Sequence, residues 1–448
     1  MPRHLLYLIV FIEGFCSLGA EVIALRRLVP HVGSSIVVTA PTIGFFLLAL
    51  ALGYASGARV AAGYTAVVAR NFLVSALLAG VGLARVSVDG LFAHLQPAGF
   101  AWLCFIGGVL CPLAWLLGQT VPVLTNLMKH MRTGEASGQA LFWSTLGSFL
   151  GSVSLSLGVM QWLGVSAAVL VCALLLALGS LRLAAPGWRS AGGAAVAAAA
   201  ALAINLLPSS EVRDTPYADY AVTPVELPGH ERPRAFFVNN SLASLIDAGE
   251  PPRYARYVQH LRHILLDELA FAGREVLVLG AGGFTLSHRE PANRYTFVDI
   301  DPQIRAIAET RFLQGPIRGE FVVDDARRFV RSTDKRYDAV VVDVFSSHTS
   351  IPGHLVTREF WQDARRVLAP DGVLLANLIL DGRLETPYAR NLLATIDSVF
   401  GRCAVEVLHK GKPLSNVVVS CYAGSRPGPA AAYSDERNAA DVDLARSR

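Results

Sequence analysis

The chain has 448 residues, of which 53% are hydrophobic, and a formal net charge of +4. Its charges are unevenly divided: residues 1–207 carry 10 Lys or Arg and 4 Asp or Glu, whereas residues 208–448 carry 29 and 31. A first half with so few charges excludes a wholly soluble enzyme and a disordered protein. The second half has no basic excess to neutralise phosphates, which argues against a nucleic-acid binder.

The first half contains a series of apolar runs, each close to the roughly 20 residues that a helix needs to cross a bilayer. Six of them are predicted to span the membrane, at about 5–25, 36–58, 70–88, 98–118, 139–159 and 163–183. A seventh run, at 191–207, is mostly Ala and Gly and could cross the membrane or lie at its interface. The sequence therefore predicts a helical domain over residues 1–207, with six or seven spans in the lipid bilayer of the cell's inner membrane.

The charges of the loops predict the orientation of this domain. With the N-terminus inside, seven Lys or Arg residues fall in inner loops and three in outer loops, which favours that orientation. Six spans would then leave the second half in the cytosol, and seven would place it outside. Because carboxylates inside a membrane are costly, Glu13 is a candidate functional residue, whereas Glu21 could pair with the nearby Arg26 and Arg27.

After a polar linker that opens at residue 208, the second half changes pattern. Residues 212–250 contain two short strand-like stretches and predict a small β subdomain, and helical periodicity follows at 253–272. Strands and helices then alternate, and their apolar runs are typical of parallel strands buried on both faces. This alternation predicts an α/β Rossmann-like, doubly wound sheet over residues 251–424. The expected strands are 275–280, 295–300, 320–324, 337–344 and 373–379, and the expected helices are 302–313, 325–333, 354–368 and 385–400.

The last predicted strands, 403–409 and 416–421, form a hairpin, so the final strand runs antiparallel to the sheet. A parallel sheet that ends in a hairpin is typical of nucleoside-type methyltransferase folds. Regular pairing places Cys403 opposite Cys421. We expect free thiols there, in a cytosolic domain, and a disulfide would indicate an oxidising compartment instead. The polar stretch 425–448 is predicted to be disordered.

Ligands of doubly wound sheets bind beyond the carboxyl ends of the strands. Gly280, Gly282 and Gly283 follow the first strand and are expected to form a turn that opens a helix, although a simple tight turn is the alternative. The later strands end in acidic residues, which are Asp299, Asp324, Asp325 and Asp343. Each of these acids could instead be a helix cap, and no cysteine spacing suggests a metal site.

The spacing suggests a role for each acid. Asp299 comes 19 residues after Gly280, close to the offset at which a carboxylate meets ribose hydroxyls. One of Asp324 and Asp325 is expected to reach the adenine amino group, and the other could cap the next helix. Asp343 would face the reacting end of the ligand.

The run from Val276 to Ile379 resembles the spermidine synthase (polyamine aminopropyltransferase) family, specifically its bacterial membrane-fused branch. The matching segments are Val-Leu-Val-Leu-Gly-Ala-Gly-Gly (276–283), Val-Asp-Ile-Asp-Pro (298–302), Asp-Asp-Ala-Arg-Arg-Phe (324–329), Val-Val-Asp-Val-Phe-Ser-Ser (341–347), Ile-Pro-Gly-His-Leu-Val-Thr-Arg-Glu (351–359) and Pro-Asp-Gly-Val-Leu (370–374). The β subdomain and the multi-span N-terminus also fit that branch.

The resemblance implies transfer of an aminopropyl group from decarboxylated S-adenosylmethionine to an amine such as putrescine, with no tightly bound cofactor. It implies that the glycine turn and Asp299 hold the nucleoside, that Asp325 contacts adenine and that Asp343 accepts the amine proton. The candidates for contact with the amine are Tyr254, Ser346, His354 and Tyr388. For His354, a local bond at a helix start is the alternative. A homodimer is compatible with the resemblance.

The sequence also departs from the family. Soluble members carry an Asp within the glycine turn, where this chain has Gly283 and Phe284, and Ser346 replaces a second acid of the fourth-strand motif. A Tyr-His-Glu trio becomes Tyr254-Ala255-Arg256. The nucleoside half of the site is therefore kept better than the amine half. Two alternatives follow: a methyltransferase that uses S-adenosylmethionine, and a non-catalytic transporter or sensor with a nucleoside-binding domain.

Overall fold

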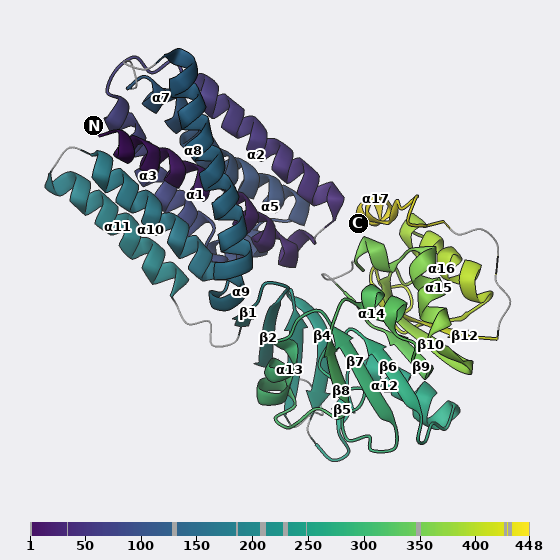
Figure 1. The fold of residues 1–448 in the computed structure, drawn as a ribbon. Helices are drawn as coiled ribbons and strands as arrows, with labels where there is room; N and C mark the ends of the chain where they lie inside the picture. Colours follow the sequence, from purple (N-terminus) through teal and green to yellow (C-terminus); the bar gives the residue numbers. More distant parts are fainter. Residues whose placement is uncertain are drawn as a thin grey trace. The chain divides into compact units, whose positions relative to one another are not determined.

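The computed structural model describes residues 2–447 apart from 34, 128–131, 185–186, 207–211, 227–231, 248, 346–350, 425–427 and 429–431. It divides into two units. The first is a bundle of helices formed by most of residues 1–209, and the second is an α/β unit formed by most of residues 210–448 (Figure 1).

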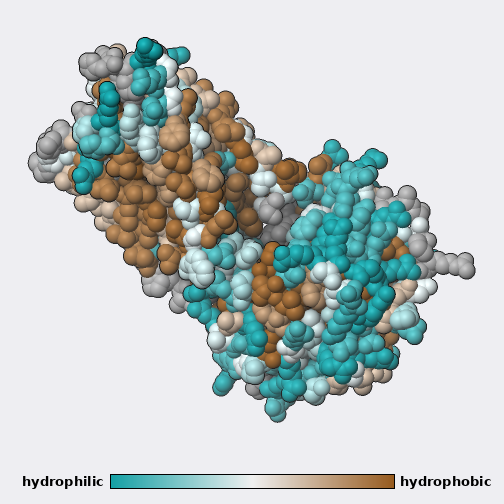
Figure 2. All heavy atoms as spheres, viewed as in Figure 1, coloured by the Kyte–Doolittle hydropathy of each residue, from teal (hydrophilic) through white to brown (hydrophobic). Residues whose placement is uncertain are grey.

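Among the described residues, the bundle contains six helices that are long and apolar enough to cross a membrane, and a shorter apolar helix at Ser190–Asn205. Hydrophobic side chains cover the flank of the bundle that is seen in Figure 2. The helical segments are α1 Arg3–Val32, α2 Ile36–Gly57, α3 Tyr64–Leu77, η1 Leu78–Gly82, α4 Arg85–His94, α5 Ala98–Phe105, η2 Ile106–Leu110, α6 Cys111–Gly118, α7 Thr120–Thr125, α8 Thr133–Ser154, η3 Leu155–Val159, α9 Met160–Leu163, α10 Val165–Leu183 and α11 Trp188–Asn205.

Helix α11, which the sequence left undecided, packs into the bundle beside α10, α3 and η1. Gly193 near its start lies against Leu73 of α3. Further along, the backbones come so close that a methyl group on Gly80 would meet the Cβ of Ala201 at 2.5 Å. Asn205 Nδ2 then donates to the carbonyl of Gly80 (2.7 Å). Because these contacts occur in the same order along both segments, α11 runs beside α3 and η1 as a seventh helix of the bundle.

The carboxylates of α1 have different surroundings. Glu13 is 1% exposed, and its Oε2 accepts a hydrogen bond from Ser144 Oγ of α8 (2.8 Å). The pairing of Glu21 with Arg26 and Arg27 is not found among the described residues. Both arginines instead form ion pairs with Asp214, at 3.5 and 3.2 Å.

The α/β unit begins with a five-stranded sheet in the order β1-β2-β3-β4-β5. Its strands are β1 Val212–Asp214, β2 Asp219–Pro224, β3 Pro233–Val238, β4 Ser241–Asp247 and β5 Arg253–Tyr254. Asn239 and Asn240, at the β3–β4 turn, adopt positive φ, as their short polar side chains allow. The segments α12 Arg256–Arg262 and η4 His263–Glu268 follow.

The main sheet has seven strands in the order β11-β12-β10-β9-β6-β7-β8. Strands β10, β9, β6, β7 and β8 are parallel, and β12 pairs antiparallel with β10. The apolar run 339–342 is at most 1% exposed, because both faces of the sheet are covered. The predicted Rossmann-like fold with a terminal hairpin is confirmed. Its elements are β6 Glu275–Leu279, β7 Arg294–Asp299, α13 Ile304–Ile307, η5 Ala308–Phe312, β8 Glu320–Val323, α14 Ala326–Ser332, β9 Tyr337–Val342, η6 Gly353–Leu355, α15 Arg358–Arg366, β10 Leu368–Leu380, α16 Pro387–Phe400, β11 Ala404–Val407 and β12 Ser415–Tyr422.

The hairpin corrects one expectation. Ala404 pairs with Ser420, so Cys403 lies opposite Cys421 as predicted. The two cysteines, however, are joined by a disulfide. The expectation of free thiols is therefore wrong. The two cysteines no longer support a cytosolic location of the domain.

The C-terminal segment corrects another. Residues 425–448 were expected to be disordered, yet Ala440–Arg446 form helix α17. Tyr433 is 1% exposed, and its hydroxyl donates to Asp443 Oδ2 (2.8 Å). The buried ring of Tyr433 and its hydrogen bond to Asp443 thus hold this segment in place. The low overall hydrophobicity of the segment had led to the expectation of disorder. Residues 425–427 and 429–431 lie outside the described residues.

Candidate active site

The carboxyl ends of β6 and β9 meet where the sheet changes direction. Strand β6 has β7 on one side and β9 on the other. The chain after β6 first adds strands on the β7 side and then crosses over to add β9 on the opposite side. Gly280 follows β6 with a φ of 87°, and a Cβ there would meet the carbonyl oxygen of Asp343 at 2.2 Å. Only glycine fits this approach, which brings the turn and the acid after β9 together at the switch point, where such sheets bind ligands.

The glycine turn does not open a helix, so that expectation is wrong. Residues 280–293 form successive turns, with positive φ at Gly280, Gly282 and Phe284. Phe284 is 1% exposed and packs edge-on against Phe297, with ring centroids 4.9 Å apart. Aromatic burial thus anchors the turn and holds Phe284 in a backbone conformation that few non-glycine residues adopt.

Asp299, at the end of β7, ties that strand to the glycine turn. Its Oδ2 accepts from the backbone N–H of Ala281 (3.0 Å), and its Oδ1 accepts from the N–H of Asp301 (3.0 Å). Burial raises the pKa of the Asp299 carboxyl to about 6, although these backbone hydrogen bonds oppose the shift. Each carboxylate oxygen keeps a second lone pair with which it could bind a hydroxyl group.

The two acids after β8 have different hydrogen-bond and ion-pair partners. Asp325 caps α14: its Oδ1 accepts from the N–H of Arg328 (2.9 Å). Its Oδ2 lies 3.2 Å from Nε2 of His354, which belongs to the short helix η6. Asp324 forms an ion pair with the Arg328 guanidinium. The structure thus brings His354 to the acids after β8 rather than leaving it to bond within its own helix.

Asp343 is the centre of a buried hydrogen-bond network. Its Oδ1 accepts from Asn377 Nδ2 (2.8 Å), and its Oδ2 accepts from the Tyr257 hydroxyl (3.1 Å). Asn377 Oδ1 in turn accepts from Asn416 Nδ2 (3.0 Å), which fixes the orientation of the Asn377 amide. Burial raises the pKa of Asp343 to about 6, and the hydrogen bonds from Asn377 and Tyr257 act in the other direction.

Sequence reasoning missed three members of this network, Tyr257, Asn377 and Asn416. Asn377 gave a signal, because it is a polar residue inside the apolar run 373–380 of strand β10 and is only 2% exposed. Buried amides in such positions usually have a specific partner. Tyr257, on an ordinary amphipathic helix, gave no comparable signal.

The remaining candidates for the amine site are scattered. The Tyr254 hydroxyl lies 2.9 Å from His288 Nδ1, and the Arg262 guanidinium lies over the Tyr254 ring. Tyr388 is 3% exposed and belongs to the hydrophobic core that also contains Tyr433. Ser346 lies outside the described residues.

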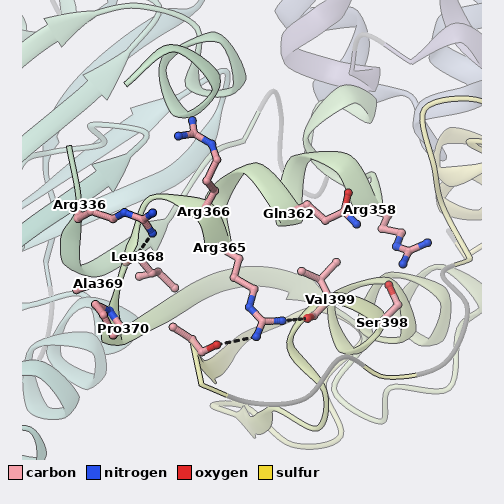
Figure 3. A pocket seen from close by; sticks show the side chains of 11 residues that line it. Arg336, Arg358, Gln362, Arg365, Arg366, Leu368, Ala369, Pro370, Ser398 and Val399 are labelled. Carbon is pink, nitrogen blue, oxygen red and sulfur yellow. Dashed lines mark hydrogen bonds between the residues drawn. The ribbon is translucent and has the colours of Figure 1, made fainter. Parts of the chain in front are cut away.

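Two cavities differ in their relation to the acids. One, of about 20 Å³, is lined by the glycine turn, Tyr257 and Asp343, and has room for about one water molecule. Another, of about 450 Å³, lies at the amino ends of β9 and β10 (Figure 3). Three arginines that line this cavity donate hydrogen bonds to backbone carbonyl groups near the ends of helices and strands. They are Arg336, Arg365 and Arg366. Because doubly wound sheets bind ligands at their carboxyl ends, the smaller cavity marks the candidate active site.

The chain is similar to several known proteins. Residues 277–372 match the family model described as a methyltransferase domain. Polyamine aminopropyltransferase 1 of Streptomyces coelicolor is 28% identical over 420 aligned residues, which cover 83% of this chain and 75% of the relative. The polyamine aminopropyltransferase of Mycobacterium tuberculosis is 27% identical over 394 residues, with coverages of 77% and 75%. Over most of its length the chain is thus similar to polyamine aminopropyltransferases.

Among solved structures, a probable spermidine synthase from Corynebacterium glutamicum aligns with a TM-score of 0.40 and 22% identity, and covers 48% of this chain and 80% of its own. Phe284, where the sequence departs from the pattern of the family it resembles, packs against Phe297 and Phe321.

Proposed function

We propose that this protein transfers the aminopropyl group of decarboxylated S-adenosylmethionine to a small polyamine-type amine. In this proposal the glycine turn and Asp299 hold the ribose, the Asp325–His354 pair lies at the adenine, and Asp343 accepts the amine proton. Support comes chiefly from Asp343: a buried carboxyl with a pKa of about 6, hydrogen-bonded to Asn377 and Tyr257 beside the glycine turn. Such a group is ionised at neutral pH and is still basic enough to accept a proton.

The chemistry requires this proton acceptor, because an ammonium ion has no free electron pair. The acceptor R–NH₃⁺ gives one proton to the Asp343 carboxylate and becomes R–NH₂. Its nitrogen then forms a bond to the aminopropyl carbon that is attached to the sulfonium sulfur. The carbon–sulfur bond breaks, and its electron pair stays on sulfur, which leaves neutral methylthioadenosine. A site that excludes water strengthens the pull of the carboxylate on the ammonium group.

The proposal is tested by incubating the purified full chain in detergent with decarboxylated S-adenosylmethionine and a panel of amines that includes putrescine. Mass spectrometry should show methylthioadenosine together with an amine that is heavier by one aminopropyl group. Methylthioadenosine without an aminopropylated product, or no turnover with any amine of the panel, would contradict the proposal.

A second candidate is methyl transfer from S-adenosylmethionine. It is favoured by the methyltransferase-type segment 277–372 and by Phe284, which leaves no carboxylate in the glycine turn to bind the donor's primary amine. The same experiment with S-adenosylmethionine decides between the two, because methyl transfer yields S-adenosylhomocysteine and adds a methyl group to the acceptor.

We propose further that the bundle spans the inner membrane and that the α/β unit faces the outside. Four observations support this side. The loop charges favour an N-terminus inside, and α11 packs into the bundle as a seventh helix. Asp214, which follows α11, pairs with Arg26 and Arg27 at the far end of α1 from the N-terminus. The Cys403–Cys421 disulfide is of a kind that persists in oxidising compartments. The donor must then be available on the outer side.

This placement predicts where a thiol can be labelled. Cys421→Ser leaves Cys403 as a half-buried free thiol in the α/β unit. A maleimide that cannot cross membranes should label this variant in sealed right-side-out vesicles and should label the unreduced native protein much less. Labelling of Cys403 only in inside-out vesicles would place the α/β unit in the cytosol.

A further inference from the structure

The larger cavity of the α/β unit lies at the amino ends of β9 and β10, away from the candidate active site, and the proposed function does not use it. Its volume of about 450 Å³ is within the range of about 300–1,000 Å³ that is usual for small-molecule sites. Among the described residues that line it there are four arginines and no Asp or Glu. Because residues 208–448 carry 31 acidic and 29 basic residues, this cavity is a local concentration of positive charge.

Two of the arginines hold the walls of the cavity. The Arg365 guanidinium donates to the carbonyl of Val399 in α16 and to that of Ala423 after β12, the latter at 2.7 Å. Arg366 donates to backbone carbonyls at the C-terminal end of α14. Carbonyl groups accept these N–H bonds without neutralising a full charge. The two guanidinium groups therefore fix the walls and leave the cavity electropositive.

The other two arginines keep most of their hydrogen-bond donors for a ligand. A guanidinium group has five N–H donors and stays charged at any physiological pH. Arg336 uses one donor on the carbonyl of Leu368 (3.1 Å). The guanidinium of Arg358 has no hydrogen-bond or ion-pair partner among the described residues. Arg331, by contrast, is exposed on the neighbouring helix α14 and forms an ion pair with Asp363 (3.1 Å).

These two arginines lie far apart in the cavity. Arg358 is the first residue of α15 and Arg366 the last, so the helix alone extends the lining by about 12 Å. Figure 3 shows Arg336 and Arg358 at opposite ends of the cavity, with Gln362 and Arg365 between them. One phosphate or carboxylate group cannot contact both ends. A ligand that uses both arginines therefore has at least two anionic groups.

The rest of the lining indicates an organic body between the anionic groups. Leu368, Pro370 and Val399 present apolar surface to the same cavity. Guanidinium groups bind phosphate oxygens through paired, charge-assisted hydrogen bonds. A phosphate group also carries more charge than a carboxylate, and so fits a small volume lined by four guanidinium charges.

We propose that this cavity binds a small organic molecule with two phosphate groups, one paired with Arg336 and the other with Arg358. The body of the molecule lies on the apolar wall between them. The inference goes beyond aminopropyl transfer and does not depend on it. The two phosphates belong either to a soluble molecule or to a lipid headgroup, because both offer the same chemistry to the arginines.

The test is calorimetry of the full chain in detergent with hexane-1,6-diol bisphosphate. The bisphosphate should bind, and hexyl monophosphate should bind about 10-fold more weakly or less tightly still, because it reaches one arginine only. Arg336→Gln and Arg358→Gln should each weaken the bisphosphate about 10-fold or more. Arg331→Gln, which removes the same charge outside the cavity, should stay within about 2-fold of the native protein. Gln362→Glu keeps all four arginines and should also weaken binding, because it adds a carboxylate between them.

Unfolding temperatures identify misfolded variants. No binding to the native protein, or an equal loss in Arg331→Gln and Arg358→Gln, would overturn the proposal. Displacement of the bisphosphate by methylthioadenosine would place it in the active site and overturn the proposal as well. Asp343→Asn should bind the bisphosphate normally, so a failure of the proposed catalysis is distinguishable from a failure of this site. Competition by cardiolipin added to the micelles would assign the two phosphates to a lipid headgroup, and lack of competition would assign them to a soluble molecule; either result supports the site.

Discussion

Asp343→Asn is expected to remove most turnover, by about 10²- to 10⁴-fold, while nucleoside affinity stays near that of the native protein. The substitution fits the network because an amide resembles the protonated carboxyl group. Its oxygen can still accept from Asn377, and its NH₂ group can donate to Tyr257, which turns its own proton to Ala243. What the amide lacks is the ability to accept the amine proton.

This result is measured as the rate of methylthioadenosine release, with the affinity for methylthioadenosine from calorimetry. Asp267→Asn serves as the matched control, because its side chain is 69% exposed on η4. Activity of the native protein should also fall as the pH drops through about 6, since the Asp343 carboxyl must be ionised to take a proton. Turnover of Asp343→Asn within a few-fold of the native rate would make the residue structural.

The second large effect is expected from Asp299→Ala. A hydrogen bond to a charged group contributes about 1.5–3 kcal/mol, so loss of the ribose contact should weaken methylthioadenosine binding by about 10- to 150-fold. The same substitution also frees the N–H groups of Ala281 and Asp301, which the carboxylate now holds. Loosening of the glycine turn would add to the loss.

Calorimetry with methylthioadenosine gives the affinity, and Asp267→Ala provides an exposed acid from the same unit as the control. Asp299→Asn separates the two causes. It keeps one acceptor oxygen but turns an NH₂ group toward a backbone donor, so it should disturb the turn more than the ribose contact. Native-like affinity in both variants would remove Asp299 from the nucleoside site.

The sequence by itself determined those features that depend on residues close together in the chain. Apolar runs of bilayer length predicted the long apolar helices, and the alternation of periods predicted the parallel sheet with its terminal hairpin. Because the carboxyl ends of parallel strands lie at one edge of a sheet, acids such as Asp299 and Asp343 could be assigned to one site from strand positions alone. Strand pairing likewise placed Cys403 opposite Cys421.

Tertiary structure decided what depends on contacts between distant segments. Tyr257 and Asp343 are 86 residues apart, and Asn377 comes 34 residues after Asp343, so no local pattern links them. The glycine turn lacks its expected helix because the burial of Phe284 against Phe297 and Phe321 fixes the backbone there. Helix α11 belongs to the bundle because small residues let it approach η1 closely, a packing gain that its marginal hydropathy does not reveal. Local periodicity thus indicated most of the elements, and contacts between distant segments decided the surroundings of Asp343.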